Sequence, residues 1–227
     1  TVDLSRTFII ANSRINSGSN NSDERRTLRY RMLSTNSFEV YRNETGTSVS
    51  YEWQVIQLDG GRVQSGQNTI ASGSNSISAT ISSVTLNNSF IIFNLAAGSG
   101  VNGAETDYYV RASYSSATQV TFTRTGNSDT VDISWFAIEM VDGTTSQSGN
   151  TSVASTDVFA TANLNSVDSS KTMIISSYQV ETGDSASATQ DSGTYSSIFT
   201  NSTTIQFDRA VQENNAANIS WFAVQFQ

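Results

Sequence analysis

The chain has 227 residues, a formal net charge of −8, and no cysteine, histidine or proline. The lack of cysteine excludes disulfides and thiolate sites, and the lack of histidine removes the commonest general base and metal ligand. The acidic balance argues against a nucleic-acid partner, because phosphates are neutralised by a basic face. No apolar run approaches the roughly 20 residues that span a bilayer, so we expect no membrane insertion.

Three kinds of segment recur along the chain. The first, residues 1–10, returns at 83–92 and 166–175. The second, residues 37–42, 119–124 and 204–209, ends each time in an arginine: Arg42, Arg124 or Arg209. The third, residues 49–58, 131–140 and 218–226, carries the three tryptophans of the chain: Trp53, Trp135 and Trp221. Such self-similarity, with a small loop insertion in the third copy, identifies a tandem repeat.

Each recurring segment alternates apolar and polar residues at period two, and clusters of Ser, Asn, Gly and Asp such as residues 16–23 separate the segments. This pattern is typical of strands joined by loops, and no stretch carries a helical period. The sequence therefore predicts an all-β fold.

A connector with its own repeat follows the first two tryptophan segments. Residues 62–66 and 145–149 both contain Gln-Ser-Gly, and the weakly alternating segments 77–81 and 158–162 come next. A complete unit would thus open with Gln-Ser-Gly and close with the tryptophan segment. This divides the chain into a partial unit 1 (1–60) and the complete units 2 (61–142) and 3 (143–227). Unit 1 lacks the opening segment and begins at Thr1, so we expect either that upstream sequence is missing or that a strand from elsewhere completes the unit.

The tryptophan segment is apolar on both faces. Alternation places Ile133 and Trp135 on one face and Phe136 and Ile138 on the other. This favours a core tryptophan over a sugar-stacking platform, and it leaves a second apolar face that marks an interface. The expected interface residues are Phe136, Ile138, Met140, Phe222, Val224 and Phe226. We expect threefold association, either of three chains in a homotrimer or of the three units within one chain.

Unit 2 resembles the H-type lectin family, which includes the snail agglutinins and the C-terminal domains of discoidins. The resemblance rests on the opening segment 62–66, the central segment 110–115 running into 120–122, and the closing segment 133–139. The tandem arrangement of these copies also resembles that of phage tail and virion-surface proteins. The resemblance implies tandem antiparallel β-sandwiches with about six strands per complete unit. It also implies trimers that bind terminal N-acetylgalactosamine or galactose at subunit boundaries.

Three groups of polar residues are candidates for recognition. Tyr108, Tyr109 and Arg111, near the central segment, are the candidate glycan contacts, although a tyrosine–arginine group suits a protein interface equally well. The recurrent arginines favour a structural role, such as pairing with a carboxylate or capping loop carbonyls, with glycan or partner recognition as the alternative. The basic cluster favours a solvated or interface strand over a site for nucleic acid or acidic polysaccharide; it comprises Arg25, Arg26, Arg29 and Arg31 around Tyr30.

Catalysis has little support, because a serine nucleophile needs a base and the chain contains no histidine. We expect no enzymatic activity, no cofactor and no metal site. The sequence predicts a non-catalytic structural or adhesive repeat protein of a virion (a phage tail or head decoration) or an extracellular surface assembly. Its partners would be copies of itself or other surface proteins. The alternative is a soluble tandem lectin that binds galactose-type or N-acetylgalactosamine-type glycans on cell surfaces.

Overall fold

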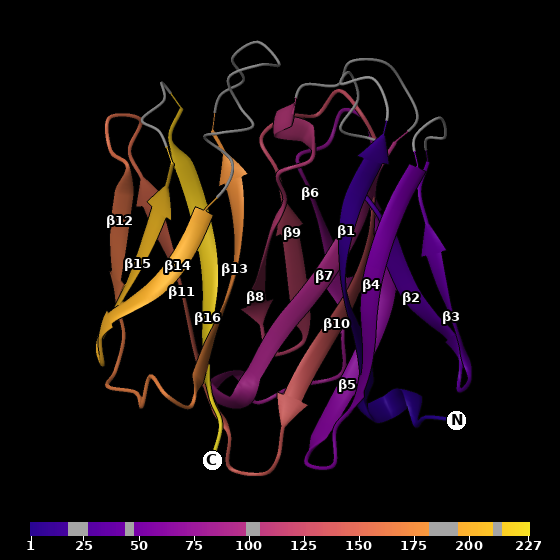
Figure 1. Cartoon of the computed structure of the whole chain (residues 1–227), viewed down its shortest axis with the longest axis horizontal. Coiled ribbons are helices and arrows are strands. Elements are labelled where there is room, and N and C mark those ends of the chain that lie inside the picture. The colour runs from indigo at the N-terminus through magenta and orange to yellow at the C-terminus, as the bar shows by residue number, and fades with distance from the viewer. Residues whose placement is uncertain (18–26, 44–47, 99–104, 182–194, 211–214) are drawn as a thin grey trace.

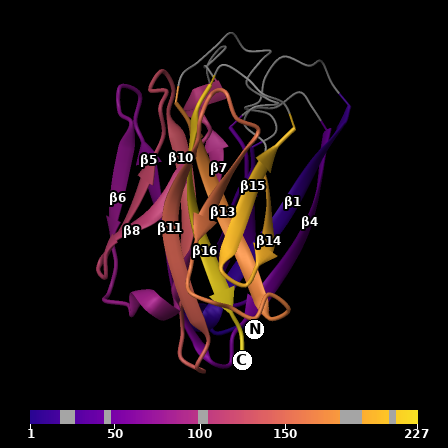
Figure 2. The ribbon, with the colours of Figure 1, turned by 90° about the vertical axis from the view of Figure 1, so that its left-hand side faces the viewer.

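The computed structural model describes residues 1–17, 27–43, 48–98, 105–181, 195–210 and 215–227. The three units lie side by side, with unit 2 between unit 1 and unit 3 (Figure 1). The strand axes are roughly aligned in both views, and paired strands run antiparallel (Figure 1, Figure 2). No helix in these residues is long and apolar enough to cross a membrane.

Unit 2 contains two antiparallel sheets of three strands. One sheet has the order β5-β10-β7 and the other the order β6-β9-β8. The strands are β5 (Gly61–Ile70), β6 (Ser76–Thr80), β7 (Ser89–Ala97), β8 (Arg111–Ser116), β9 (Gln119–Thr123) and β10 (Val131–Met140), with short 3-10 turns η3 (Leu86–Asn88) and η4 (Glu105–Asp107). The central strand of the first sheet, β10, is the tryptophan segment.

Unit 3 repeats this arrangement with the sheets β11-β16-β13 and β12-β15-β14. Its strands are β11 (Thr145–Val153), β12 (Phe159–Asn163), β13 (Thr172–Val180), β14 (Tyr195–Asn201), β15 (Thr204–Arg209) and β16 (Ala217–Gln225). The predicted all-β fold of tandem antiparallel sandwiches, with six strands in each complete unit, is therefore confirmed.

Unit 1 has four strands after the 3-10 turn η1 (Leu4–Arg6). They are β1 (Thr7–Ser17), β2 (Arg29–Ser34), β3 (Ser37–Tyr41) and β4 (Ser48–Gln57), and they form the two-stranded sheets β1-β4 and β2-β3. In register these correspond to β7-β10 and β8-β9 of unit 2. The described residues contain no counterparts of β5 and β6 in unit 1.

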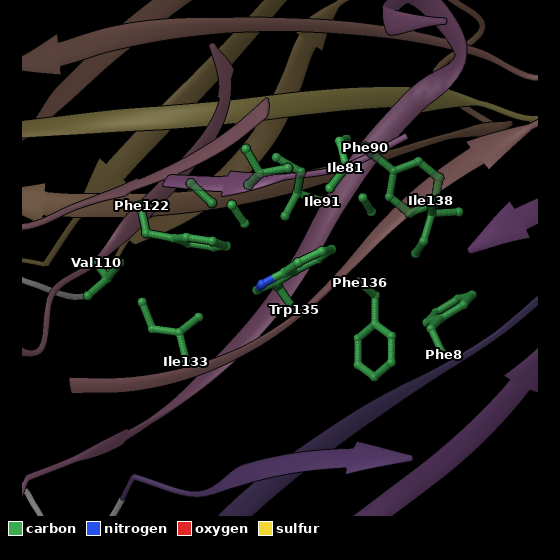
Figure 3. Close-up of a cluster of buried hydrophobic side chains, with 14 of the residues drawn as sticks. Phe8, Ile81, Phe90, Ile91, Val110, Phe122, Ile133, Trp135, Phe136 and Ile138 are labelled. Atoms are coloured by element: carbon green, nitrogen blue, oxygen red, sulfur yellow. The ribbon is translucent and has the colours of Figure 1, made fainter. Parts of the chain in front are cut away.

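The tryptophans fill the sandwich interior only in the complete units. Trp135 and Trp221 are 5% and 4% exposed, whereas Trp53 is 50% exposed. Figure 3 shows Trp135 lying toward Phe122, on the inner side of β10, while Phe136 lies beside Phe8 of unit 1. The prediction of a core tryptophan is wrong for Trp53, because no strand among the described residues lies beside β4 where β5 lies beside β10.

Two of the recurrent arginines are buried and connect loops through hydrogen bonds to backbone carbonyls. Arg124 donates to the carbonyl oxygens of Ala71 and Ser74 at 3.0 Å, and to that of Asp129. Arg209 does the same in unit 3, where its donors reach the carbonyl oxygens of residues 154, 155, 157 and 215. A planar guanidinium with five donors can satisfy several carbonyls at once. The geometry is that of the structural role, the capping of loop carbonyls.

Candidate site at the boundaries between units

The boundary between units 2 and 3 is made by the edge of β8 against the outer face of the sheet β11-β16-β13. Arg111 donates from Nε to Gln179 Oε1 at 2.9 Å and from Nη1 to Asn150 Oδ1 at 3.1 Å. The backbone N–H of Ala112 donates to Ser177 Oγ at 3.1 Å. Burial lowers the pKa of the Arg111 guanidinium, and the carboxylate of Glu181 opposes that shift. The edge of β8 therefore binds the polar residues Asn150, Ser177 and Gln179 on the outer face of unit 3.

The boundary between units 1 and 2 repeats these contacts with different side chains. The backbone N–H of Tyr30 donates to Asn94 Oδ1 at 2.6 Å, and Arg31 Nη1 donates to Gln67 Oε1 at 2.6 Å. By strand register, Tyr30 corresponds to Ala112, and Asn94 corresponds to Ser177. The same edge-on-face contact thus joins both pairs of neighbouring units.

Beside these polar contacts, the apolar outer faces of the units pack against one another and are buried. Of the six expected interface residues, Phe136, Ile138, Met140, Phe222 and Val224 are at most 4% exposed, and only Phe226 is substantially exposed, at 38%. The five buried residues belong to one apolar cluster that also contains Phe8 and contacts Ile56, Leu58, Met173 and Ile175. These five side chains are covered within a single chain, so they offer little surface to another copy. Threefold association of chains stays a prediction.

The three glycan candidates do not gather into one pocket. Tyr108 is buried inside unit 2, where its hydroxyl donates to Asp129 Oδ2 at 2.9 Å. The ring of Tyr109 lies 5.3 Å from that of Tyr178, in unit 3. Arg111 uses its guanidinium across the same boundary. Tyr109 and Arg111 therefore lie where two units meet, and glycan binding by these residues stays a prediction.

The described part of the basic cluster lies on β2, where Tyr30 and Arg31 contact unit 2. Arg31 Nε donates to Glu39 Oε2 at 2.8 Å, and the Tyr30 hydroxyl donates to the carbonyl of Ala11 at 3.0 Å. Arg29 lies over the ring of Tyr41, with its guanidinium carbon 4.7 Å from the ring centroid. Arg25 and Arg26 lie outside the described residues. The contacts of Tyr30 and Arg31 with unit 2 place β2 in the boundary.

Sequence reasoning missed an open cleft of about 630 Å³ between β11 and β12 of unit 3, lined by Gly149, Thr151, Asn163, Asn165 and Trp221 among others. Trp221 is almost fully buried, and its Nε1 has no hydrogen-bond partner. In unit 2 the corresponding Trp135 Nε1 donates to Asn68 Oδ1 at 2.8 Å. Thr151 holds the Asn68 position in unit 3. The change from Asn to Thr between aligned repeats is the sequence signal that could have identified this site.

The interior of unit 2 also holds a buried carboxylate. Asp107 accepts from the backbone N–H of Ser128 at 3.0 Å, and its other oxygen has no partner. Burial raises the pKa of Asp107, although this hydrogen bond and the Arg124 guanidinium, 3.9 Å away, favour the charged form. Both groups are fully enclosed by loops, so they serve the fold and are not accessible to a substrate. Within the described ranges, no three acidic side chains cluster closely enough to hold a metal ion.

Comparisons with known proteins add no relative. No family model matches the chain, and neither the curated proteins nor the solved structures contain a match. The resemblance of unit 2 to the H-type lectin family therefore stays a prediction based on the residues quoted for it.

Proposed function

We propose that the chain is a non-catalytic structural repeat protein of a virion or extracellular surface assembly, in which sandwich units join edge on face. The observation that supports this proposal most is the repeated boundary. A strand edge binds the outer face of the next unit at both boundaries, through Tyr30 and Asn94 and again through Ala112 and Ser177. A heterologous contact that repeats either closes a ring or continues into further copies.

Both halves of this contact recur at the ends of the row of units. Asn12, the counterpart of Asn94, is exposed on β1 beside Glu52. Ser197 holds in β14 the position that Tyr30 holds in β2, and its neighbour Ile198 is 50% exposed. The hydrogen bonds described above join unit 1 to unit 2 and unit 2 to unit 3. Unit 3 of one copy can therefore dock on unit 1 of the next by the contact already used inside the chain.

The predicted result is self-association of the intact protein. Light scattering coupled to size-exclusion chromatography should give masses that rise above the 24.5 kDa of one chain as the protein concentration increases. Asn12→Arg should return the protein to the monomer mass, because the larger charged side chain blocks the edge of β14. Asn127→Arg alters another exposed asparagine, in the loop after β9, and should leave association unchanged. A monomer at every concentration, or equal association by both variants, would contradict the proposal.

The cleft of unit 3 favours glycan binding as a second candidate function. The polar lining of this cleft, which includes Asn150, Thr151 and Asn163, favours a ligand with hydroxyl groups. A glycan array probed with the intact chain and with Thr151→Asn separates the two functions. Sugar signals that vanish in the variant would support the lectin function. A blank array, together with a solution mass that rises with concentration, would support only the structural role.

A further inference from the structure

At the boundary between units 2 and 3, one residue of the outer face, Gln179 of β13, contacts two strands of unit 2. Arg111 of β8 donates from Nε to Gln179 Oε1 at 2.9 Å, and the hydroxyl of Thr123, at the end of β9, donates to the same oxygen at 3.3 Å. Gln179 Nε2 in turn donates to the Thr125 hydroxyl at 3.0 Å. The face position of Gln179 thus meets the positions of Arg111 and Thr123 across the boundary.

Strand register identifies the residues that hold these positions in units 1 and 3. Arg14 of β1 holds the face position in unit 1, because it and Gln179 each pair with the residue three positions before the tryptophan of the unit. Asp208 of β15 corresponds to Thr123, because each directly precedes the recurrent arginine of its unit. Ser196 of β14 pairs with Asp208 and therefore holds the position of Arg111. Docking of unit 3 of one copy on unit 1 of the next would bring Asp208 and Ser196 to Arg14.

These three side chains are chemically complementary. Arg14 is exposed on β1, and Ser196 is exposed and small, which leaves space for a guanidinium group. Asp208 is half-buried on the outer face of its sheet, where its Oδ1 accepts from Gln206 Nε2 at 2.7 Å. This hydrogen bond orients the carboxylate and leaves Oδ2 for a further donor. Hydrogen bonds between an arginine and a carboxylate are stronger than those between neutral groups, because both partners are charged.

The two boundaries inside the chain hold uncharged residues at the same two positions. Between units 1 and 2 the face position is Ala96, and the position before the recurrent arginine is Tyr41. Between units 2 and 3 these positions hold the glutamine and threonine described above. Between copies they would hold Arg14 and Asp208, which carry opposite charges. The same register thus gives neutral boundaries inside the chain and a charged boundary between copies.

We propose that Asp208 of one copy and Arg14 of the next form an ion pair that directs unit 3 onto unit 1 and makes association of copies sensitive to salt. This inference rests on the proposed edge-on-face joining of copies. Salt weakens a pair that solvent reaches, because counter-ions screen both charges. The boundaries inside the chain use neutral acceptors and a buried apolar cluster. Salt should therefore separate copies and leave each chain folded.

Charge reversal in the intact chain, followed by light scattering coupled to size-exclusion chromatography, tests this inference. Arg14→Glu and Asp208→Arg each place like charges across the boundary, so each variant alone should associate at least about tenfold more weakly than the unaltered chain. An equal mixture of the two variants should recover association, because every contact between the two variants joins opposite charges. Lys171→Glu is the matched control; it reverses another exposed cation, next to the opposite end of β13 from the Gln179 position, and should leave association unchanged.

A double variant, Arg14→Gln with Asp208→Thr, gives the boundary between copies the neutral pair found between units 2 and 3. Added salt should weaken association of the unaltered chain more than that of this variant.

The outcomes separate this inference from the proposed function. Association that is lost in Asn12→Arg but unchanged in both reversal variants would overturn the ion pair and leave the joining of copies standing. A mixture of the reversal variants that stays monomeric, although both keep the urea midpoint of the unaltered chain and that chain associates, would also overturn the ion pair. An unaltered chain that is monomeric at every concentration would overturn both proposals.

Discussion

Replacing Arg124 should destabilise unit 2 far more than replacing a surface arginine. Its side chain is fully buried and donates to carbonyls of three loops, at Ala71 and Ser74, at Asp107, and at Asp129. Arg124→Ala leaves these four carbonyls without that donor and opens a cavity. An unsatisfied buried acceptor costs about 1–3 kcal/mol, and some of the carbonyls will gain water, so we expect a loss of about 3–5 kcal/mol.

Urea unfolding monitored by circular dichroism measures this loss. The midpoint temperature of thermal unfolding should fall by roughly 2–4 °C for each kcal/mol lost. Arg124→Lys should recover little, because an ammonium group cannot span carbonyls on three loops. Arg62→Ala is the matched control, since the Arg62 side chain is 70% exposed and 3.8 Å from Glu139. Its effect should stay below about 0.5 kcal/mol. Equal effects of Arg124→Ala and Arg62→Ala would refute the role assigned to the buried arginine.

Three further substitutions probe other parts of the structure. Thr151→Asn should raise stability by about 0.5–1.5 kcal/mol, because it gives Trp221 Nε1 the acceptor that Asn68 provides in unit 2; an unchanged urea midpoint would contradict this. Burial raises the pKa of Asp107 above its ordinary 3.8, so the folded state binds the proton more tightly and its stability should fall as pH rises from that value toward the raised pKa. Asp107→Asn should remove this component from the pH profile of urea unfolding, and an identical profile would count against it. Arg111→Ala should cost about 1.5–3 kcal/mol through lost contacts with unit 3; full stability with lost glycan binding would favour the recognition role.

The fold was accessible from sequence because repeat and alternation report the same physical fact, a strand with an inner and an outer face. The recurrence of Trp135 and Trp221 aligned the central strands of both complete units. The recurrence of Arg124 and Arg209 indicated a shared structural role, and the loop carbonyls supply it. These features depend on local pattern and on comparison of the repeats with one another.

The features that the sequence did not reveal depend on neighbours. Trp53 is exposed because no described strand lies on that side of β4, although its own segment matches the others. The position of Arg111 on a strand edge against unit 3 requires the packing of two units, which alternation within one unit does not encode. The polar sequence around Tyr108 favours an exposed side chain, but the side chain is buried and its hydroxyl donates to Asp129.

Cysteine cross-linking tests the central claim, edge-on-face joining of copies, most directly, and the chain has no native cysteine to interfere. Two single variants, Asn12→Cys and Ser197→Cys, are mixed under mild oxidation, and the products are separated by mass without reduction. The account predicts a disulfide between the two variants at twice the monomer mass, well above the yield from Asn12→Cys mixed with Asn127→Cys. A double variant that closes the disulfide within one chain, or a mixture that gives no more product than the control pair, would contradict the joining of copies through this contact.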